Sequence, residues 1–491
     1  MLWGFSHHYA SLPASCHLPA LPTPVAAPRL LLFNDGLAAE LGLDPAAIRA
    51  VAAQALSGNV LPEDAQPVAM AYAGHQFGNF VPQLGDGRAL LLGELRDPAG
   101  ALRDLHLKGS GRTGFSRGGD GRAAVGPMLR EYVISEALHA LGIPTTRSLA
   151  VVATGEPVYR ERPLPGAVLA RVAASHLRVG SFEFLAARGD LTGLQALLAH
   201  VIQRHDPEAA RADCPALAVL EGVAARQARL LAHWLRVGFI HGVMNTDNMT
   251  LSGESIDFGP CAFLDDYHPR RRFSSIDHQG RYAFMNQPGI AQWNLARLAE
   301  CLLPLIEPGD PEQAVPKVMP VLEGFIHQFD ALHQADLRRK LGLAGVEDGD
   351  TALAQSLLQL MQQGRADFTL AWRGLGGLLA PDTSAVARWR ELFGAGVDVD
   401  DWLEAWQARR ARDPADASAA VAMIEATSPA VIPRNHQVEA ALRAASEDDD
   451  LGPVQALLAA LRAPYAMRQR DDPYLAPPRP GEEVHATFCG T

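Results

Sequence analysis

A lysine followed by a loop rich in glycine and arginine suggests a binding site for a polyphosphate. Lys108 ends a short apolar run, and the loop occupies residues 109–122. Glycine lets backbone N–H groups approach a phosphate, and arginine donates charge-assisted hydrogen bonds to phosphate oxygens. Residues 83–88, with Gly85 and Gly87, are a weaker sign of the same chemistry, because Gly-Asp-Gly is also typical of a plain hairpin turn. For residues 109–122 the alternative is a solvated, flexible loop.

Three further charged residues fit a polyphosphate site. Glu131 lies on an amphipathic segment just after the loop, where it could pair with Lys108 and fix the ammonium beside the phosphates. Arg171 and Arg178 stand in a segment with few acidic neighbours and could clamp phosphate oxygens. Taken singly, each of the three is also typical of an ordinary surface residue.

A pattern typical of a catalytic loop lies further along the chain. His241 precedes Asn248 by seven residues, and Asp257 of an Asp-Phe-Gly run follows Asn248 by nine. In protein kinases and aminoglycoside kinases, a His-x-Asp-x4-Asn loop supplies the base and a metal ligand, and the Asp-Phe-Gly aspartate holds Mg²⁺. The spacing therefore predicts a kinase-like fold in which Asn248 and Asp257 bind Mg²⁺ or Mn²⁺.

The pattern departs from that of kinases at one position. Val243 stands where a kinase has its catalytic aspartate, and valine cannot accept a proton. Another carboxylate, Asp247, directly precedes Asn248. The chain therefore resembles a kinase that keeps its nucleotide and metal but lacks the usual base, which disfavours simple phosphoryl transfer.

Short apolar runs and helical periods indicate the elements that carry these residues. The runs at 89–95, 105–108 and 148–154 are bounded by Gly, Asp or Pro and predict strands. A helical period over 127–142 predicts the helix that carries the glutamate. Helical patterns dominate from residue 181 onward. We therefore expect an α+β, protein-kinase-like fold with two lobes, the first rich in strands and the second large and helical.

The same patterns predict how the chain is divided. Residues 249–251 and 255–258 are expected to form a strand-like pair, and the chain is expected to begin with an irregular, Pro-rich lead and short helices. The predicted divisions are an N-terminal extension (1–65), a kinase-like N-lobe (66–180), a C-lobe with the catalytic and metal-binding loops (181–315), and a helical C-terminal extension and tail (316–491).

Composition argues against several classes of protein. The chain has 491 residues, of which 48% are hydrophobic and 20% charged, which is typical of a globular protein. Its formal net charge of −12 argues against a protein that coats nucleic acid or an anionic membrane. Yet residues 103–130 hold five arginines and one lysine against two aspartates, a local cationic patch. With dispersed cysteines, no signal peptide and no long apolar run, the sequence predicts a soluble cytoplasmic protein without a zinc site.

Several long motifs resemble those of the SelO family. They lie at residues 72–88, in the loop after Lys108, and at 256–260, 277–284 and 432–439, and the similarity extends from about residue 4 to the C-terminus. Near the end of the chain, Cys489 matches the cysteine or selenocysteine that the family usually carries there. Some bacterial members can bridge this tail to a cysteine after the Asp-Phe-Gly segment, so a link from Cys489 to Cys261, with redox control through it, is a hypothesis. Members are protein adenylyltransferases on a pseudokinase fold. The resemblance thus implies transfer of AMP from ATP to Ser, Thr or Tyr of protein substrates with Mg²⁺ or Mn²⁺, and some members use UTP.

The resemblance also implies roles for individual residues. ATP is expected to lie reversed relative to kinases, so that the β- and γ-phosphates occupy a deep cationic cradle. Asp247 matches the proton acceptor, Asn248 and Asp257 match the metal ligands, and Glu131 matches the partner of Lys108. The positions that match nucleotide contacts are Gly85, Gly87, Arg88, Lys108, Asp120, Gly121, Arg171, Arg178 and Asp257.

Two other kinds of function remain open at this point. A protein kinase or small-molecule kinase would transfer the γ-phosphate instead, and Val243 argues against both. A non-catalytic nucleotide-binding scaffold would dock partners on the helical residues 316–465. A scaffold needs no metal ligands, so the presence of Asn248 and Asp257 argues against it.

Overall fold

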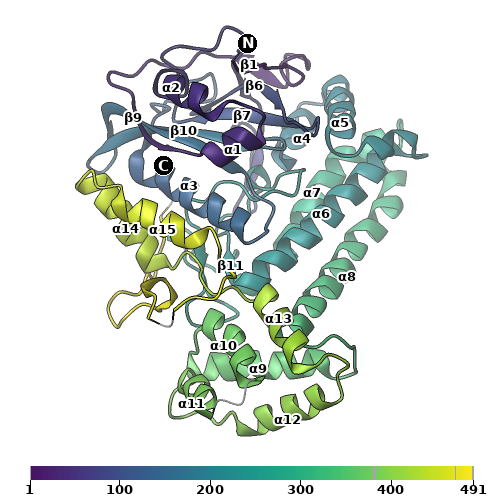
Figure 1. Ribbon diagram of the computed structural model, residues 1–491. Helices are drawn as coiled ribbons and strands as arrows, with labels where there is room; N and C mark the ends of the chain where they lie inside the picture. Colours follow the sequence, from purple (N-terminus) through teal and green to yellow (C-terminus); the bar gives the residue numbers. More distant parts are fainter. Residues whose placement is uncertain (1, 380–382, 470, 489–491) are drawn as a thin grey trace.

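A sheet at one end of the molecule and long helices beyond it define the architecture (Figure 1). The computed structural model describes residues 2–379, 383–469 and 471–488. Within them, most strands lie in the first part of the chain and helices dominate after residue 178, as the sequence predicts for a mixed α and β protein. The division at residues 65, 180 and 315 stays a prediction.

The main sheet has eight strands, and their pairings are all antiparallel. Their order is β1-β3-β6-β7-β10-β9-β2, and β8 pairs with β10 outside this path. The strands are β1 (His17–Pro19), β2 (Arg29–Phe33), β3 (Val68–Met70), β6 (Ala89–Arg96), β7 (Leu102–Lys108), β8 (Ala123–Ala124), β9 (Arg147–Tyr159) and β10 (Pro163–Ala173).

Two of these strands lie where no strand was predicted. Residues 1–65 contribute β1 and β2, which form the two edges of the sheet, rather than only an irregular lead and helices. Both are short, and their extended conformation depends on pairing with β3 and β9, which come much later in the chain. A local pattern carries no sign of such distant partners.

The alternation of side chains along β7 separates the core from the pocket. Leu105 and Leu107 are fully buried on one face, together with α1 (Asp35–Glu40) and α2 (Pro45–Ala55). Because successive side chains point to opposite faces of a strand, Lys108 points to the other face. The sheet thus buries its leucines under α1 and α2 and directs its lysine away from them.

Helix α3 (Val125–Ala140) covers that other face, where it packs against β9 and β10. It begins directly after β8 and the Gly- and Arg-rich loop. Its observed bounds lie within two residues of the predicted helix at 127–142. Glu131 is buried on this helix and therefore approaches the sheet rather than solvent.

Beyond the sheet, α6 packs against both α7 and α8, and α4 packs against α5 and α7 (Figure 1). The long helical patterns of the sequence are confirmed here. The helices are α4 (Val179–Ala186), α5 (Leu191–His205), α6 (Pro215–Val237), α7 (Gln287–Ile306) and α8 (Val315–Lys340).

A two-stranded pair closes the base of the predicted catalytic loop. β11 (Phe239–Ile240) pairs with β12 (Ala262–Phe263), so the two ends of the loop formed by residues 241–261 lie side by side. The predicted pair between 249–251 and 255–258 was wrong. Thr250 instead bridges to Arg178, and Ser255 bridges to Thr145, because the backbone groups of this loop bond to segments on either side of it.

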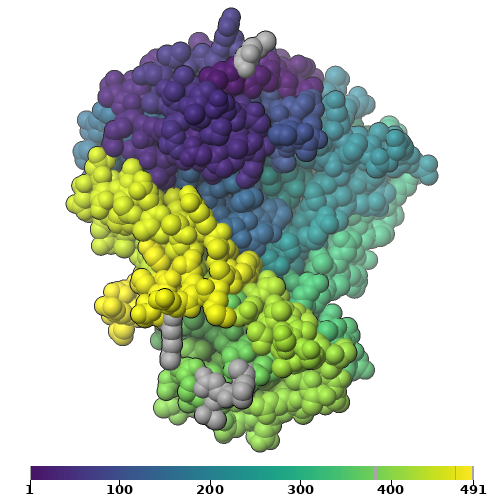
Figure 2. Space-filling model, in the orientation of Figure 1, coloured from purple at the N-terminus to yellow at the C-terminus, as the bar shows by residue number. Residues whose placement is uncertain are grey.

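The remaining helices form two separate groups. The first lies far from the sheet, and the second returns to pack on α3, as the yellow segment in Figures 1 and 2 shows. No helix in the described residues is both long and apolar enough to cross a membrane. The first group is α9 (Asp350–Gly364), α10 (Phe368–Gly374), α11 (Thr383–Glu391), α12 (Asp400–Ala411) and α13 (Ala417–Thr427), and the second is α14 (Asn435–Glu447) and α15 (Gly452–Leu461).

Candidate active site

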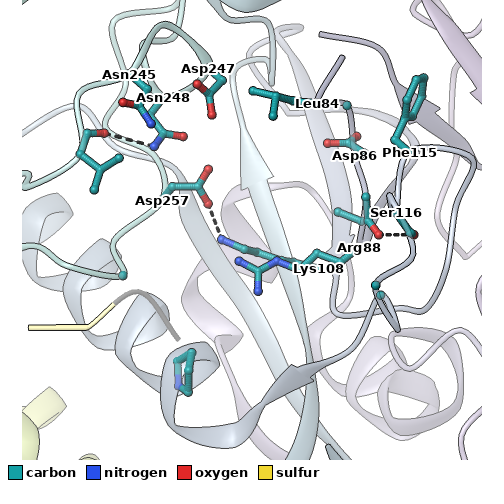
Figure 3. A pocket seen from close by; sticks show the side chains of 18 of the residues that line it. Leu84, Asp86, Arg88, Lys108, Phe115, Ser116, Asn245, Asp247, Asn248 and Asp257 are labelled. Carbon is teal, nitrogen blue, oxygen red and sulfur yellow. Dashed lines mark hydrogen bonds and ion pairs between the residues drawn. The ribbon is translucent and has the colours of Figure 1, made fainter. Parts of the chain in front are cut away.

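A cavity of about 530 Å³ lies between the sheet, α3 and the loop that β11 and β12 close. Its volume is in the range of small-molecule and cofactor sites. Figure 3 shows the loop residues on one wall and the Gly- and Arg-rich segments on the other. All twelve site residues predicted from the sequence line this cavity, namely Gly85, Gly87, Arg88, Lys108, Asp120, Gly121, Glu131, Arg171, Arg178, Asp247, Asn248 and Asp257.

Two cations and two carboxylates form an ion cluster at the back of the cavity. Lys108 Nζ donates to Glu131 Oε2 at 2.6 Å and also pairs with Asp257, the contact marked in Figure 3. Arg171 Nη1 donates to Glu131 Oε1 at 3.1 Å and to Asp257 Oδ1 at 3.2 Å. Burial would raise the pKa of Asp257, but Lys108 and Arg171 outweigh it and hold that pKa well below its usual range. The Asp257 carboxylate is therefore ionised.

The register of two neighbouring strands places the two cations together. Lys108 of β7 lies opposite Leu169 of β10, and Arg171 follows two residues later on the same face. Asp257 meets them from the loop with a φ of +63°, a left-handed conformation that aspartate tolerates better than most residues. Sheet register thus explains why an arginine far from Lys108 in the chain joins the same cluster.

Asn248 and Asp257 present oxygen atoms suited to a hard divalent cation. The Asn248 amide nitrogen donates to the Val243 carbonyl at 3.1 Å, which leaves the Oδ1 atom of Asn248 available as a ligand. No cluster of three or more His, Cys, Asp or Glu side chains that could hold a metal occurs in the described residues. Two protein oxygens completed by phosphate oxygens are the usual arrangement for Mg²⁺, so the donor set fits Mg²⁺ or Mn²⁺.

Asp247 keeps one carboxylate oxygen without a hydrogen-bond partner. Its Oδ2 accepts from the Gln76 amide at 3.4 Å, while its buried Oδ1 has no partner. Gln76 belongs to a hairpin formed by β4 (Gly74–Gln76) and β5 (Asn79–Val81). Gly74 in that hairpin permits the approach, because a Cβ there would lie 2.3 Å from Asp247 Oδ1. Burial raises the pKa of Asp247 to about 6.

Arg178 contributes a buried cation with spare hydrogen-bonding capacity. Its guanidinium lies 4.2 Å from the centre of the Tyr72 ring, a cation–π contact. Its Nε donates to the His176 carbonyl at 3.1 Å and its Nη1 to the Asp247 carbonyl at 3.3 Å, but its buried Nη2 has no partner. A buried donor without a partner is costly, so an anionic ligand beside it would supply the missing acceptor.

Glycine is required at two close contacts in the cavity walls. Gly85 has a φ of +67°, and a Cβ there would lie 2.2 Å from the ring of Phe115. Gly121 has a φ of +68°, and its Cβ would lie 2.1 Å from the Gly111 carbonyl. The loop at 109–122 is therefore packed at its two ends and at Phe115, whereas residues 117–120 are exposed.

Some residues that line the cavity were not found by sequence reasoning. Arg160 lies at the turn between β9 and β10, and its guanidinium holds the Asp120 carboxylate with bonds of 2.8 and 3.2 Å. Gln76 and Asn245 also line the cavity. Gln76 stands within the family-like motif at 72–88, which could have identified it, but nothing in the sequence around Arg160 distinguishes it from a surface arginine.

The cysteine match lies beyond what the structure describes. Cys489 is outside the described residues. Cys261, next to the cavity segment, is buried, its thiol donates to the Phe258 carbonyl at 3.1 Å, and burial raises its pKa to about 12. A link between the two cysteines and any redox control through it stay a prediction.

Comparison with known proteins places this site in a family. A family model described as protein adenylyltransferase SelO matches residues 5–462. A protein of Rhizobium etli (strain CIAT 652), named protein nucleotidyltransferase YdiU, is 56% identical over 489 residues, covering 100% of this chain and 97% of that protein. A protein of the same name from Rhodopseudomonas palustris (strain BisB5) is 56% identical over 488 residues, covering 99% of each. The chain belongs to the SelO family of protein adenylyltransferases.

Proposed function

We propose that this protein transfers AMP from ATP to a Ser, Thr or Tyr hydroxyl of a protein substrate and releases pyrophosphate. The observation that carries the proposal is the combination of residues in one cavity. The ion cluster around Lys108 and the oxygen atoms of Asn248 and Asp257 suit a nucleotide and a divalent cation. Val243, in contrast, occupies the position of the kinase base. The arrangement of sheet, glutamate-bearing helix and metal loop supports a kinase-like fold with two lobes.

The cationic residues would bind the part of ATP that leaves. In AMP transfer the acceptor oxygen forms a bond to the α-phosphorus, and the bond from that phosphorus to the oxygen bridging to the β-phosphorus breaks. Negative charge then develops on pyrophosphate. Lys108, Arg171 and the unpartnered Nη2 of Arg178 lie where preorganised donors can stabilise that charge, with Glu131 fixing the ammonium and the guanidinium. The glycine loops and Arg88 complete the walls around the nucleotide.

Asp247 would take the proton of the acceptor hydroxyl. Its side chain is buried at the cavity wall, and its unpartnered Oδ1 is a free acceptor. The Gln76 amide holds the other oxygen, so the carboxylate has a defined orientation. Asp247 thus supplies the basic group that Val243 cannot, four residues later in the same loop.

Asn248 and Asp257 would hold Mg²⁺ or Mn²⁺. When bound, the cation neutralises phosphate charge and orients the phosphate oxygens. Asp257 pairs with Lys108 in the structure, so the same carboxylate would be shared between the lysine and the cation.

A labelling experiment separates this function from its alternatives. The full chain is incubated with Mg²⁺, a protein mixture and ATP labelled on either the α- or the γ-phosphate. We expect protein to be labelled from the α-phosphate only. Label from the γ-phosphate alone would establish a kinase, and ATP binding with no transfer to any protein would establish a scaffold.

The same reaction identifies the preferred nucleotide and the acceptor. Mass spectrometry of modified peptides after parallel reactions with ATP and UTP distinguishes AMP from UMP adducts and locates the hydroxyl that carries them. Repeating the reaction with Mg²⁺ or Mn²⁺, and with a chelator, determines which cation supports transfer. Localisation in the cytoplasm remains a prediction from the sequence and is consistent with a need for ATP.

A further inference from the structure

Two stacked histidines lie directly behind Arg171, and neither lines the cavity. His106 lies opposite Arg171 in the register of β7 and β10, and His176 follows Arg171 by five residues. Both side chains are fully buried, and their ring centres lie 4.4 Å apart at an angle of 22°. Neither histidine was singled out by the sequence, and the proposed mechanism does not use them.

Hydrogen bonds from Arg171 determine the protonation of both rings. Arg171 Nε donates to His176 Nε2 at 3.2 Å, and Arg171 Nη2 bonds to His106 Nδ1 at 3.4 Å. A guanidinium has donors only, so each of these ring nitrogens must be an unprotonated acceptor. Burial lowers the pKa of His106, and it lowers that of His176 to about 3, so both rings are neutral.

The second nitrogen of each ring faces a carboxylate. His106 Nε2 lies 3.0 Å from Asp86 Oδ2, and His176 Nδ1 lies 3.1 Å from Asp104 Oδ2, so each N–H donates to a carboxylate oxygen. Asp86 also accepts the Met70 backbone N–H at 3.0 Å. This second set of contacts specifies one tautomer for each histidine and holds both rings in place.

Asp104 and Arg171 each have further charged partners. Asp104 also accepts from Arg204 at 2.5 Å, so the carboxylate behind His176 is itself held by a cation. On the opposite side, Arg171 Nη1 reaches Glu131 and Asp257 of the ion cluster. All three nitrogens of the Arg171 guanidinium are therefore oriented, one by the carboxylates of Glu131 and Asp257 and two by neutral rings. A carboxylate in place of either ring would hold the guanidinium but would add a third negative charge beside it.

We propose that His106 and His176 are positioning residues that hold Arg171 toward the nucleotide phosphates without adding negative charge beside it. The proposal rests on the proposed function, because it assigns Arg171 to the phosphates of ATP. His176 also orients the second arginine, since its backbone carbonyl accepts from Arg178 Nε. The pair thus supports both guanidinium groups of the cradle from the side away from the ligand.

Substitutions that keep or remove the acceptor test the proposal. ATP affinity of the full chain is measured by calorimetry, without any transfer reaction. His106→Leu and His176→Leu are each expected to weaken ATP binding about tenfold, as expected when a hydrogen bond to a charged group is lost. His106→Asn and His176→Gln, which offer an acceptor oxygen near the lost ring nitrogen, should stay within about threefold of the wild type. Equal losses in the Leu and in the Asn or Gln variants would overturn the proposal.

A double-mutant cycle separates positioning from a merely structural role. In an Arg171→Met background, the leucine substitutions should cause no further loss of ATP affinity, because the histidines act through that arginine. Additive losses would contradict the proposal. If wild type binds ATP but transfers nothing, the proposed function fails while this test still decides the role of the histidines.

A measurement on the unsubstituted protein covers the case in which the leucine variants do not fold. Nitrogen-15 NMR of labelled histidine reads the protonation state of each ring directly. We expect the Nε2–H tautomer for His106 and the Nδ1–H tautomer for His176, and we expect both signals to shift when ATP is added. A protonated ring at neutral pH, or signals that ignore ATP, would overturn the proposal.

Discussion

Two clusters of charged residues in this molecule have similar composition, but one lies at the candidate site and the other holds helices together. The pocket cluster is formed by Lys108, Glu131, Arg171 and Asp257 at the back of the cavity. The α12 cluster is formed by Arg409, Asp350 and Asp413 among the helices far from the sheet. Both are largely withdrawn from solvent, so burial alone does not distinguish a site from a structural ion pair.

The difference lies in what adjoins each cluster, because the arginine of each has acceptors for all three of its nitrogens. In the α12 cluster, all three nitrogens of Arg409 have acceptors, at 2.7 to 3.3 Å. Asp413 there also accepts backbone N–H groups of Ala344 and Gly345. Beside the pocket cluster, Arg178 Nη2 and Asp247 Oδ1 are buried without partners. Arg410 Nε, beside the α12 cluster, is also buried without a partner. Of these three residues, Arg178 and Asp247 line the cavity of about 530 Å³, so their unused hydrogen-bonding capacity marks a candidate ligand site there.

The largest expected effect is on catalysis, from a change in the pocket cluster. Asp257→Asn removes a charge but keeps the shape, and we expect AMP transfer from α-labelled ATP to fall roughly a thousandfold. The melting temperature should change little, because Lys108 and Arg171 remain paired with Glu131. Full activity in this variant would remove the distinction between the two clusters.

The matching change in the α12 cluster should affect stability instead. Arg409→Met leaves the buried Asp350 carboxylate without its cation, whereas Asp413 keeps Arg410. We expect the free energy of unfolding in urea to fall by about 3 kcal/mol. Transfer per folded molecule should equal that of the wild type. Arg412→Met is the control, since that exposed arginine pairs with Glu347 at the surface and should cost less than about 1 kcal/mol. Similar losses in both variants would contradict the interpretation.

A smaller effect is expected at the rim of the cavity. Arg160→Ala frees the Asp120 carboxylate, which lines the cavity. We expect the KM for ATP to rise about fivefold with little change in kcat, since this arginine positions a loop at the proposed nucleotide site. Arg162→Ala, two residues away, removes an exposed arginine whose partner is Glu447, and its kinetics should match the wild type. A kcat effect in Arg160→Ala would place this residue closer to the chemistry.

The smallest expected effect concerns a carboxylate in neither cluster. Glu254 accepts the Ala174 N–H at 2.9 Å and the Ser252 hydroxyl at 2.8 Å, and burial raises its pKa to about 7. The folded state therefore holds this proton more tightly than the unfolded state, so the contribution of Glu254 to stability is fully present below about pH 4.5 and is lost as the pH rises through 7. In urea unfolding at pH 5 and pH 8, Glu254→Gln should lose about 1 kcal/mol less than the wild type. An equal decline in both would show that Glu254 does not titrate as stated.

The site residues predicted from the sequence lie together, and their roles stay predictions. All twelve line one cavity. Asn248 and Asp257 were predicted from their spacing with His241, Lys108 from the glycines that follow it, and most other positions from motifs that resemble the SelO family. The helix predicted at residues 127–142 was also found within two residues of its bounds. A short spacing and a helical period both involve residues that are close together in the chain, so both can be recognised without the structure.

Prediction failed where a residue or strand depends on a partner far along the chain. The edge strands β1 and β2 have strand conformation because β3 and β9 lie beside them. Arg160 and Gln76 contact Asp120 and Asp247 only because folding brings hairpins against loops that are 40 and 171 residues away. No composition or period within either segment reports such a contact.

The sequence by itself determined the kind of chemistry, because Lys108, Asn248 and Asp257 are residue types that bind phosphate and metal, and Val243 is one that cannot act as a base. The sequence also singled out Arg171, but only the tertiary structure decided how this arginine is held. The antiparallel register that sets His106 opposite Arg171 exists only after β7 and β10 have paired, and so do the contacts by which two neutral rings orient the guanidinium.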